Sequence, residues 1–246
     1  MKRIIHAFFM CQSMFCAVPC PCKVWDEEAR FALLWCLPLV GLEIGLLWWG
    51  SALACAFLGL SPLITGLILC ILPFLATGFI HMDGFMDVTD AVGSCRDLQR
   101  RREILKDSHV GSFAVIGCVM LMLAQFAFST AAASKADLRV LVVIPVLSRC
   151  CSAVAVALLP KMSTSQYAQK KAAAADYLIP AGFAALAFAY ALWIGVRGAA
   201  VLLILLAAYG LALGKGYRSL EGMNGDISGY AQTISELAAL GALAIL

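Results

Sequence analysis

The stretch HMDGFMDVTDAVGSCRDLQRRREILKDSHVG, residues 81–111, follows directly on PLITGLILCILPFLATGFI, residues 62–80. The upstream stretch is long and apolar enough to enter a bilayer. The downstream stretch carries five aspartates and five basic residues. Ionisable groups at membrane depth are costly and indicate a functional site. This junction therefore predicts an integral membrane fold and also the position of its site.

The composition extends this prediction to the whole chain. Of its 246 residues, 63% are hydrophobic and 13% are charged, which is more apolar surface than one soluble domain can bury. We expect a single membrane-embedded domain over residues 1–246, an all-α, polytopic integral membrane helix bundle of about seven transmembrane helices. The expected spans are residues 31–58, 61–80, 111–134, 140–160, 178–196, 199–213 and 229–246. Only Arg197 and Gly198 separate the fifth and sixth, so the sequence leaves open whether they are one span or two.

The opening segment, residues 1–30, is predicted to be an amphipathic or half-inserted helix at the membrane interface. A cleaved signal peptide is disfavoured because Gln12 and Ser13 interrupt its apolar run. The eleven cysteines do not predict disulfides, since many fall within spans, where cysteine acts as a small apolar side chain. One cluster, whose role the sequence leaves open, consists of Cys11, Cys16, Cys20 and Cys22.

The distribution of positive charge predicts the topology. Segments 1–30, 81–110, 161–177 and 214–228 hold 14 of the 18 lysines and arginines. Cytoplasmic loops near membrane ends collect such residues. We therefore expect a multi-pass protein of the cell (cytoplasmic) membrane, with these four segments and the active site on the cytoplasmic side.

The acidic residues of the junction form a stripe. Asp83, Asp87 and Asp90 are spaced i, i+4 and i+7, which places them on one face of a helix. Their mutual repulsion would be relieved by a shared divalent cation, and an oxygen-only ligand set suits Mg2+ or Mn2+. Gly84 would let a ligand approach the backbone closely. The stripe therefore predicts a metal site for phosphate chemistry, although a solvated polar helix end is the simpler alternative.

Basic and acidic side chains elsewhere could complete this site. Arg96 and Lys106 follow the stripe and suit a phosphate or pyrophosphate, although the positive flank of the next span explains them equally well. Arg149 lies inside an expected span and should be matched by a carboxylate, such as Glu43 or Asp226, or by a substrate phosphate. The chain has no glycine-rich nucleotide-binding loop and no sign of nucleic-acid binding.

At this point the motifs resemble a known family. The signature of the cobalamin synthase family, the adenosylcobinamide-GDP ribazoletransferases, is similar to His81-Met82-Asp83-Gly84-x-x-Asp87-x-x-Asp90, then Arg96-Asp97, then Glu103-Ile104-Leu105-Lys106-Asp107-Ser108-x-x-Gly111. Upstream, Pro19-x-Pro21 with Trp25 and the run Leu37 to Leu42 resemble the family's opening. Downstream, Leu147-Ser148-Arg149 and Gly225-Asp226-x-x-Gly229 with Glu236 resemble its later motifs. The similarity extends along nearly the whole chain.

The resemblance implies a reaction and a site. The family joins adenosylcobinamide-GDP to alpha-ribazole or its 5′-phosphate in a Mg2+-dependent transfer that releases GMP and gives adenosylcobalamin or its 5′-phosphate. Under this interpretation, the metal ligands are Asp83, Asp87 and Asp90, and either Asp87 or Asp107 could accept a proton. The residues that bind substrate would be Arg96, Lys106, Ser108, Arg149 and Asp226. The preferred ribazole form, the number of metal ions and the oligomeric state, a homo-oligomer included, stay open.

Two other classes of protein also place carboxylates on membrane helices. CDP-alcohol phosphatidyltransferases do so, but their motif has Ala-Arg after Asp-Gly-x-x and a later Asp-x-x-x-Asp, and here Asp87 follows Met86 instead. A cation- or proton-coupled transporter would often show paired broken helices in its two halves, whereas the acidic motif here is single. A transporter would also move solute without forming GMP.

Overall fold

The structure is a computed structural model that describes residues 2–135, 137–162 and 172–246. Its regular elements within these residues are helices, apart from one isolated parallel bridge between Lys161 and Met223. In chain order they are α1 (Lys2–Phe15), η1 (Glu27–Ala32), α2 (Leu33–Phe57), α3 (Pro62–Ala76), α4 (Ile80–Gly93), α5 (Leu98–Ile104), α6 (Ser112–Lys135), η2 (Leu138–Val142), α7 (Ile144–Leu158), α8 (Ala175–Ile194), α9 (Val196–Leu220) and α10 (Gly225–Ile245). The all-α expectation is confirmed.

The number of spans is smaller than expected. Among the described residues, five helical segments are long and apolar enough to cross a membrane, or six if the bent pair α3 and α4 counts as one. These five segments are Glu27–Phe57, Ser112–Ser134, Leu138–Leu158, Ala175–Ile194 and Val196–Leu220. About seven were expected, and the count differs because α3 and α4 form a bent pair and because α10 does not meet this test of length and composition.

The break between α3 and α4 explains the first difference. The two helices meet at an angle of 89°. Gly78 and Phe79 at the break both have left-handed backbones, with φ of 59° and 63°, and a left-handed residue does not continue a helix. The Thr77 hydroxyl donates to the carbonyl oxygens of Pro73 and Phe74 at 3.0 and 3.1 Å and so satisfies the end of α3. The acidic stripe thus begins on a new helix that points in a new direction.

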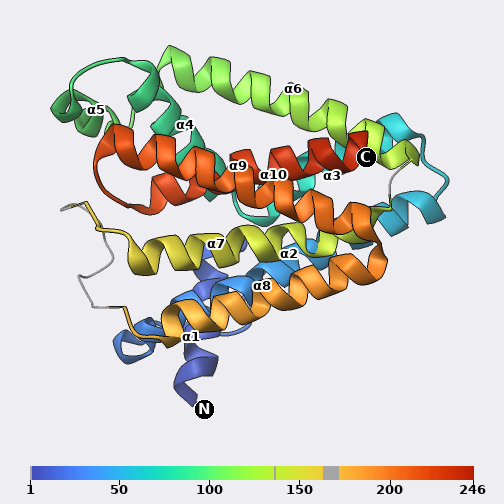
Figure 1. Cartoon of the computed structure of the whole chain (residues 1–246), viewed down its shortest axis with the longest axis horizontal. Coiled ribbons are helices and arrows are strands. Elements are labelled where there is room, and N and C mark those ends of the chain that lie inside the picture. The colour runs from blue at the N-terminus through green and yellow to red at the C-terminus, as the bar shows by residue number, and fades with distance from the viewer. Residues whose placement is uncertain (1, 136, 163–171) are drawn as a thin grey trace.

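The fifth and sixth expected spans are separate helices. α8 and α9 meet at Gly195, whose φ of 149° suits glycine. A Cβ on Gly198 would lie 2.8 Å from the Ala191 carbonyl oxygen, so the two helices pack closely next to the turn. In Figure 1 they run back against each other as a hairpin. Asp226 therefore lies at the same end of the molecule as the acidic stripe.

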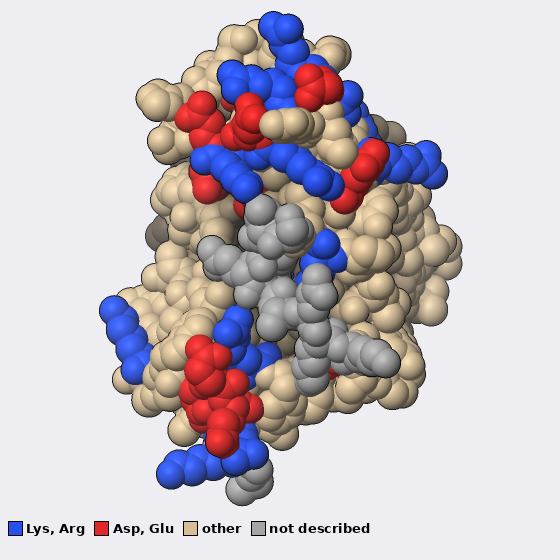
Figure 2. Space-filling view, turned by 90° about the vertical axis from the view of Figure 1, so that its left-hand side faces the viewer, with Lys and Arg blue, Asp and Glu red and all other residues tan. Residues whose placement is uncertain are grey.

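Most of the charged segments gather at one end of the bundle. In Figure 1, α5, the end of α7 and the connection from α9 to α10 lie on the left, whereas the turn between α8 and α9 and the C-terminus lie on the right. Figure 2 views the left-hand end and shows basic and acidic side chains in an upper and a lower group. We call this the charged end. Segments that are far apart in the sequence but share positive charge thus share a place in the fold.

α10 is the central helix, and it lies against α4, α6, α7 and α9. Glycines let α4 approach it closely. A Cβ on Gly84 would lie 2.9 Å from the backbone Cα and O of Asp226, and one on Gly229 would lie 3.2 Å from the backbone of His81. Small residues serve this purpose where membrane helices pack. Gly84 therefore makes room for α10, not for a ligand as the sequence suggested.

This contact predicts the effect of a single methyl group. Replacing Gly84 with alanine should destabilise the protein by about 1–3 kcal/mol, since the clashing atoms belong to a backbone that cannot rotate away. The measurement is the midpoint of thermal unfolding in one detergent. Gly210→Ala in α9 is the matched control because nothing lies within 4 Å of its added Cβ. Equal midpoints for the two variants would show that α4 and α10 are not held together here.

Candidate active site

Acidic residues from two helices converge where α4 meets α10. Asp83 is exposed and Asp87 is half-buried on α4, and Asp226 is half-buried in the first turn of α10. Asp87 lies within electrostatic range of Asp83 and Asp226, and Asp226 within range of Asp83. We call these three residues the acidic cluster. In the described part of the chain, no three His, Cys, Asp or Glu side chains are close enough to hold a metal ion by themselves.

Asp90 has different partners from the rest of the stripe. Its side chain is 8% exposed, and its two oxygens accept hydrogen bonds from the backbone N–H groups of Gly111, at 2.5 Å, and Ala114, at 2.9 Å. A Cβ on Gly111 would lie 2.6 Å from both oxygens, so only glycine fits there. Asp90 therefore satisfies free N–H groups at the start of α6, where a negative charge is favoured.

Asn224 supports Asp226, and the sequence analysis did not single it out. Its Oδ1 accepts from the backbone N–H of Ile227 at 3.0 Å and so caps the start of α10. Its Nδ2 donates to Asp226 Oδ2 at 2.6 Å. Asparagine is a favoured N-cap residue, so its position just before Gly225 could have predicted this cap from the sequence. The cap holds the Asp226 carboxylate in place beside α4.

The basic segment that follows α4, residues 96–106, in part anchors α5 to the end of α9. Arg101 Nη1 donates to the Ser219 carbonyl oxygen at 3.0 Å, and Arg102 Nε donates to that of Leu220 at 3.0 Å. Positive side chains are favoured at a helix C-terminus, where carbonyl groups lack partners. These two arginines therefore have a structural role.

Two other basic side chains of this segment are available for a ligand. Arg96 and Lys106 are exposed, and within the described ranges their side chains show no hydrogen bond or ion pair. Arg100 differs, because it pairs with Glu103 at 2.8 Å. Arg96 and Lys106 are therefore the predicted phosphate-binding residues that still have free donors at the charged end.

Asp107 and Ser108 lie in the exposed connection between α5 and α6. The Asp107 carboxylate accepts hydrogen bonds from the backbone N–H of His109, at 3.0 Å, and pairs with its ring nitrogen Nδ1, at 2.7 Å. The hydrogen bond from the His109 side chain lowers the pKa of Asp107. A carboxylate with a lowered pKa is a weak general base, which argues against proton transfer to Asp107.

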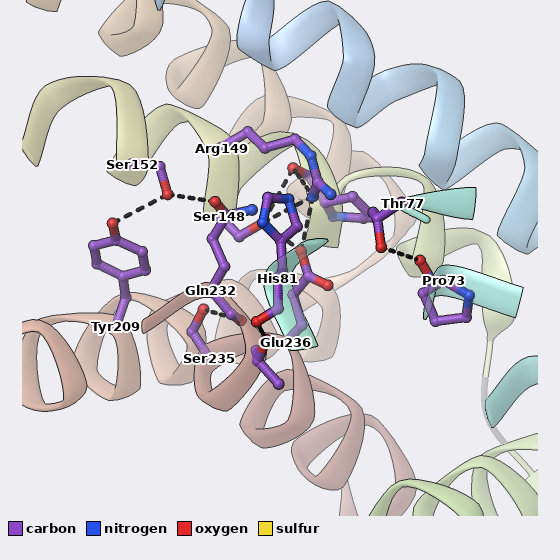
Figure 3. Close-up of polar contacts among 12 residues, drawn as sticks. Pro73, Thr77, His81, Ser148, Arg149, Ser152, Tyr209, Gln232, Ser235 and Glu236 are labelled. Atoms are coloured by element: carbon purple, nitrogen blue, oxygen red, sulfur yellow. Dashed lines mark hydrogen bonds and ion pairs between the residues drawn. The ribbon is translucent and has the colours of Figure 1, made fainter. Parts of the chain in front are cut away.

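Arg149 is buried in the middle of the bundle with Glu236 as its partner. It is 1% exposed, and its Nη1 donates to Glu236 Oε1 at 2.8 Å (Figure 3). Ser148 Oγ donates to the same oxygen at 2.6 Å. The sequence analysis suggested Glu43 or Asp226 as the structural partner of Arg149. Glu43 instead accepts a hydrogen bond from Gln12 Nε2 at 3.2 Å. The carboxylate that offsets this buried charge comes from α10.

Two hollows border the start of α4. A cavity of about 300 Å3 is lined by His81, Gln232, Asn224 and Asp226 among others. A more open hollow of about 510 Å3 lies beside Asp83. Ile80 and Met14 line both. A substrate could therefore reach Asp226 through the first hollow and Asp83 through the second.

Comparison with known proteins identifies relatives of the whole chain. A family model described as cobalamin-5-phosphate synthase matches residues 7–244. Adenosylcobinamide-GDP ribazoletransferase of Clostridium perfringens strain SM101 is 32% identical over 100% of both chains. The protein of the same name from Clostridium botulinum strain Alaska E43 is 30% identical over 98% of this chain and 97% of its own. No solved structure matches the chain.

The contacts of Asp90 predict a loss of stability on substitution. Asp90→Asn removes the negative charge and one of the two acceptors at the start of α6, which should cost about 0.5–2 kcal/mol. Asp83→Asn, on the same helix but exposed and repelled by Asp87 and Asp226, should not lower the thermal midpoint. Both are measured by unfolding in detergent. A midpoint that falls for Asp83→Asn and not for Asp90→Asn would contradict the assignment.

The Arg149–Glu236 pair predicts strong coupling. Arg149→Met leaves a largely buried carboxylate without its partner and should cost about 3–5 kcal/mol. Adding Glu236→Gln should restore part of that loss, so the double variant is more stable than the sum of the single changes implies. The exposed pair Asp137 and Arg139 is the control, and its loss should change stability little. Purely additive effects at Arg149 and Glu236 would show that the two side chains do not interact.

Proposed function

The chain belongs to the cobalamin-5-phosphate synthase family, and we propose that it is an adenosylcobinamide-GDP ribazoletransferase of cobalamin biosynthesis. It would join adenosylcobinamide-GDP to alpha-ribazole or its 5′-phosphate. The observation that carries this proposal is the convergence of Asp83, Asp87 and Asp226 from two closely packed helices, beside hollows that a substrate can enter.

The reaction is a substitution at phosphorus. A hydroxyl oxygen of the ribazole forms a bond to the phosphorus nearer the corrinoid, and the bond from that phosphorus to the oxygen of the departing GMP breaks. The hydroxyl loses its proton, and GMP leaves with the electron pair of the broken bond. Such transfers depend mainly on positioning and on stabilising negative charge around the phosphates.

We propose Mg2+ as the cofactor, held by the acidic cluster. Mg2+ sites in phosphoryl transfer commonly use one or two carboxylates together with substrate phosphates and water, so three preformed protein ligands are not required. The donor atoms of Asp83, Asp87 and Asp226 are all carboxylate oxygens, which fit this ion. When bound, Mg2+ would neutralise charge on the diphosphate and on the departing GMP. Asp90, with both oxygens on backbone N–H groups, would position this face of α4 instead of holding the ion.

The basic residues divide into two groups under this proposal. Arg96 and Lys106, with Ser108 beside them, would bind phosphate oxygens at the charged end. Arg149 would maintain the fold, because Glu236 already neutralises it. Since Asp107 is a weak base, the proton of the attacking hydroxyl would leave to a carboxylate of the acidic cluster or to solvent.

The charged end would face the cytoplasm in the cell membrane. The described basic residues of the four positive segments lie there or close by (Figures 1 and 2), and positive residues are retained on that side. Substrates and GMP are water-soluble at their phosphate ends and would enter and leave from it. Lipid would surround the long apolar helices.

The central test is GMP release. Protein purified in detergent should form GMP from adenosylcobinamide-GDP only when alpha-ribazole or its 5′-phosphate and Mg2+ are all present, and chelation of Mg2+ should abolish it. Asp83→Asn, Asp87→Asn and Asp226→Asn should each lower turnover at least about a hundredfold, the scale lost when transition-state electrostatics are removed. Asp137→Asn, with its carboxylate paired to Arg139 away from the site, should keep normal turnover.

Other outcomes separate the alternatives. Transport of a solute into sealed vesicles without GMP formation would indicate a transporter. Release of CMP from a CDP-alcohol would indicate a phosphatidyltransferase. Full turnover by all three asparagine variants at low Mg2+ would show that the acidic cluster is a polar helix end and not a metal site.

A further inference from the structure

The 300 Å3 cavity is built as a binding site. One wall is apolar and includes Leu34, Leu37 and Val156. Its polar lining includes Gln232, His81 and Asp226 of the acidic cluster. Ligand cavities typically combine a mostly apolar lining with a few placed polar groups. This cavity has both, and one of its ends is the proposed reaction site.

Gln232 presents an unused donor to this cavity. The side chain is 3% exposed, and its Oε1 accepts from Ser152 Oγ at 2.8 Å, which in turn lies 3.1 Å from the Tyr209 hydroxyl (Figure 3). In this arrangement the amide oxygen of Gln232 faces Ser152. The other end of the amide, Nε2, is buried and has no hydrogen-bond partner among the described residues. Buried polar groups normally have a partner. Among the described residues, His81 Nε2 beside the same cavity also lacks one, so both atoms are candidates to bind a ligand.

The size of the cavity selects between the two substrates. At about 300 Å3, it is at the lower limit for drug-sized molecules, for which cavities of roughly 300–1,000 Å3 are usual. A volume of this size suits a nucleoside, whereas a corrinoid macrocycle is much larger. A second hollow of about 370 Å3, which includes Trp25, shares Met14, Leu34 and Val156 with the first. The two hollows thus adjoin at these apolar residues. The second also carries charged side chains, such as Glu27 and Asp176, and offers room for an aromatic base beside Trp25.

We propose that this cavity is the subsite for the acceptor nucleoside, in which Gln232 Nε2 donates to a ribose oxygen and the apolar wall contacts the base. This assignment rests on the proposed function and adds the place and the recognition of the acceptor. The donor diphosphate then reaches the acidic cluster from the side of Asp83. The two substrates meet at the line of contact between α4 and α10.

The test compares two glutamines with the same burial. Gln232→Met should raise the KM for alpha-ribazole about tenfold, the scale of one lost hydrogen bond, and leave the KM for adenosylcobinamide-GDP unchanged. Gln125→Met is the matched control, because Gln125 is also 3% exposed but lies on α6 beside a separate void of about 20 Å3. Its KM values should match those of the unmodified protein.

A second measurement keeps the test informative if Gln232→Met folds poorly. Gln232→Glu retains the shape of the side chain but loses the N–H donors, and it should also raise only the acceptor KM. Two acceptors that each lack one of the two non-reacting ribose hydroxyls should be compared. One of them should bind the unmodified protein more weakly, and Gln232→Glu should not weaken its binding further. An acceptor KM unchanged in a folded Gln232 variant, or a raised KM for the donor instead, would overturn the subsite. Absence of GMP release by the unmodified protein would overturn the proposed function itself.

Discussion

The close approach of α4 to α10 is the constraint on which the site depends. Gly84 lies against the backbone of Asp226, and Gly229 against that of His81. With helix axes this near, carboxylates at the start of α10 must share space with those on α4. Their repulsion is the cost of the packing, and a bound cation would remove it. The same contact thus positions the acidic cluster and creates its need for a positive partner.

Much of the fold could be predicted from hydropathy. The expected spans at residues 111–134 and 140–160 match the helical segments Ser112–Ser134 and Leu138–Leu158 to within two residues, because a run of apolar residues must be helical in lipid. The break at Gly78 and Phe79 could not be found in this way, since the apolar run continues through it. α10 is not among the apolar candidates because it carries polar side chains such as Gln232, which is buried among other helices.

The site was predictable by residue type but not by partner. The spacing of the stripe placed Asp83 and Asp87 together correctly on one helix. It could not separate Asp90 from them, because the N–H groups that Asp90 binds are 21 and 24 residues further along the chain. Likewise, a buried Arg149 requires a carboxylate, but Glu236 lies 87 residues away. Such pairings depend on which helices become neighbours, and a single sequence does not contain that information locally.

The shortness of α3 has a consequence for the lipid around the site. Its 15 residues rise about 22 Å, at 1.5 Å per residue, whereas the hydrocarbon layer is roughly 30 Å thick. A helix of this length does not reach both headgroup layers by itself, so the turn into α4 would lie beneath the level at which the longer helices emerge. Hydrophobic mismatch of this kind is relieved by local thinning of the bilayer. The protein would therefore hold a dimple in the membrane over α4, through which water and a phosphorylated substrate reach carboxylates that sit below the average surface.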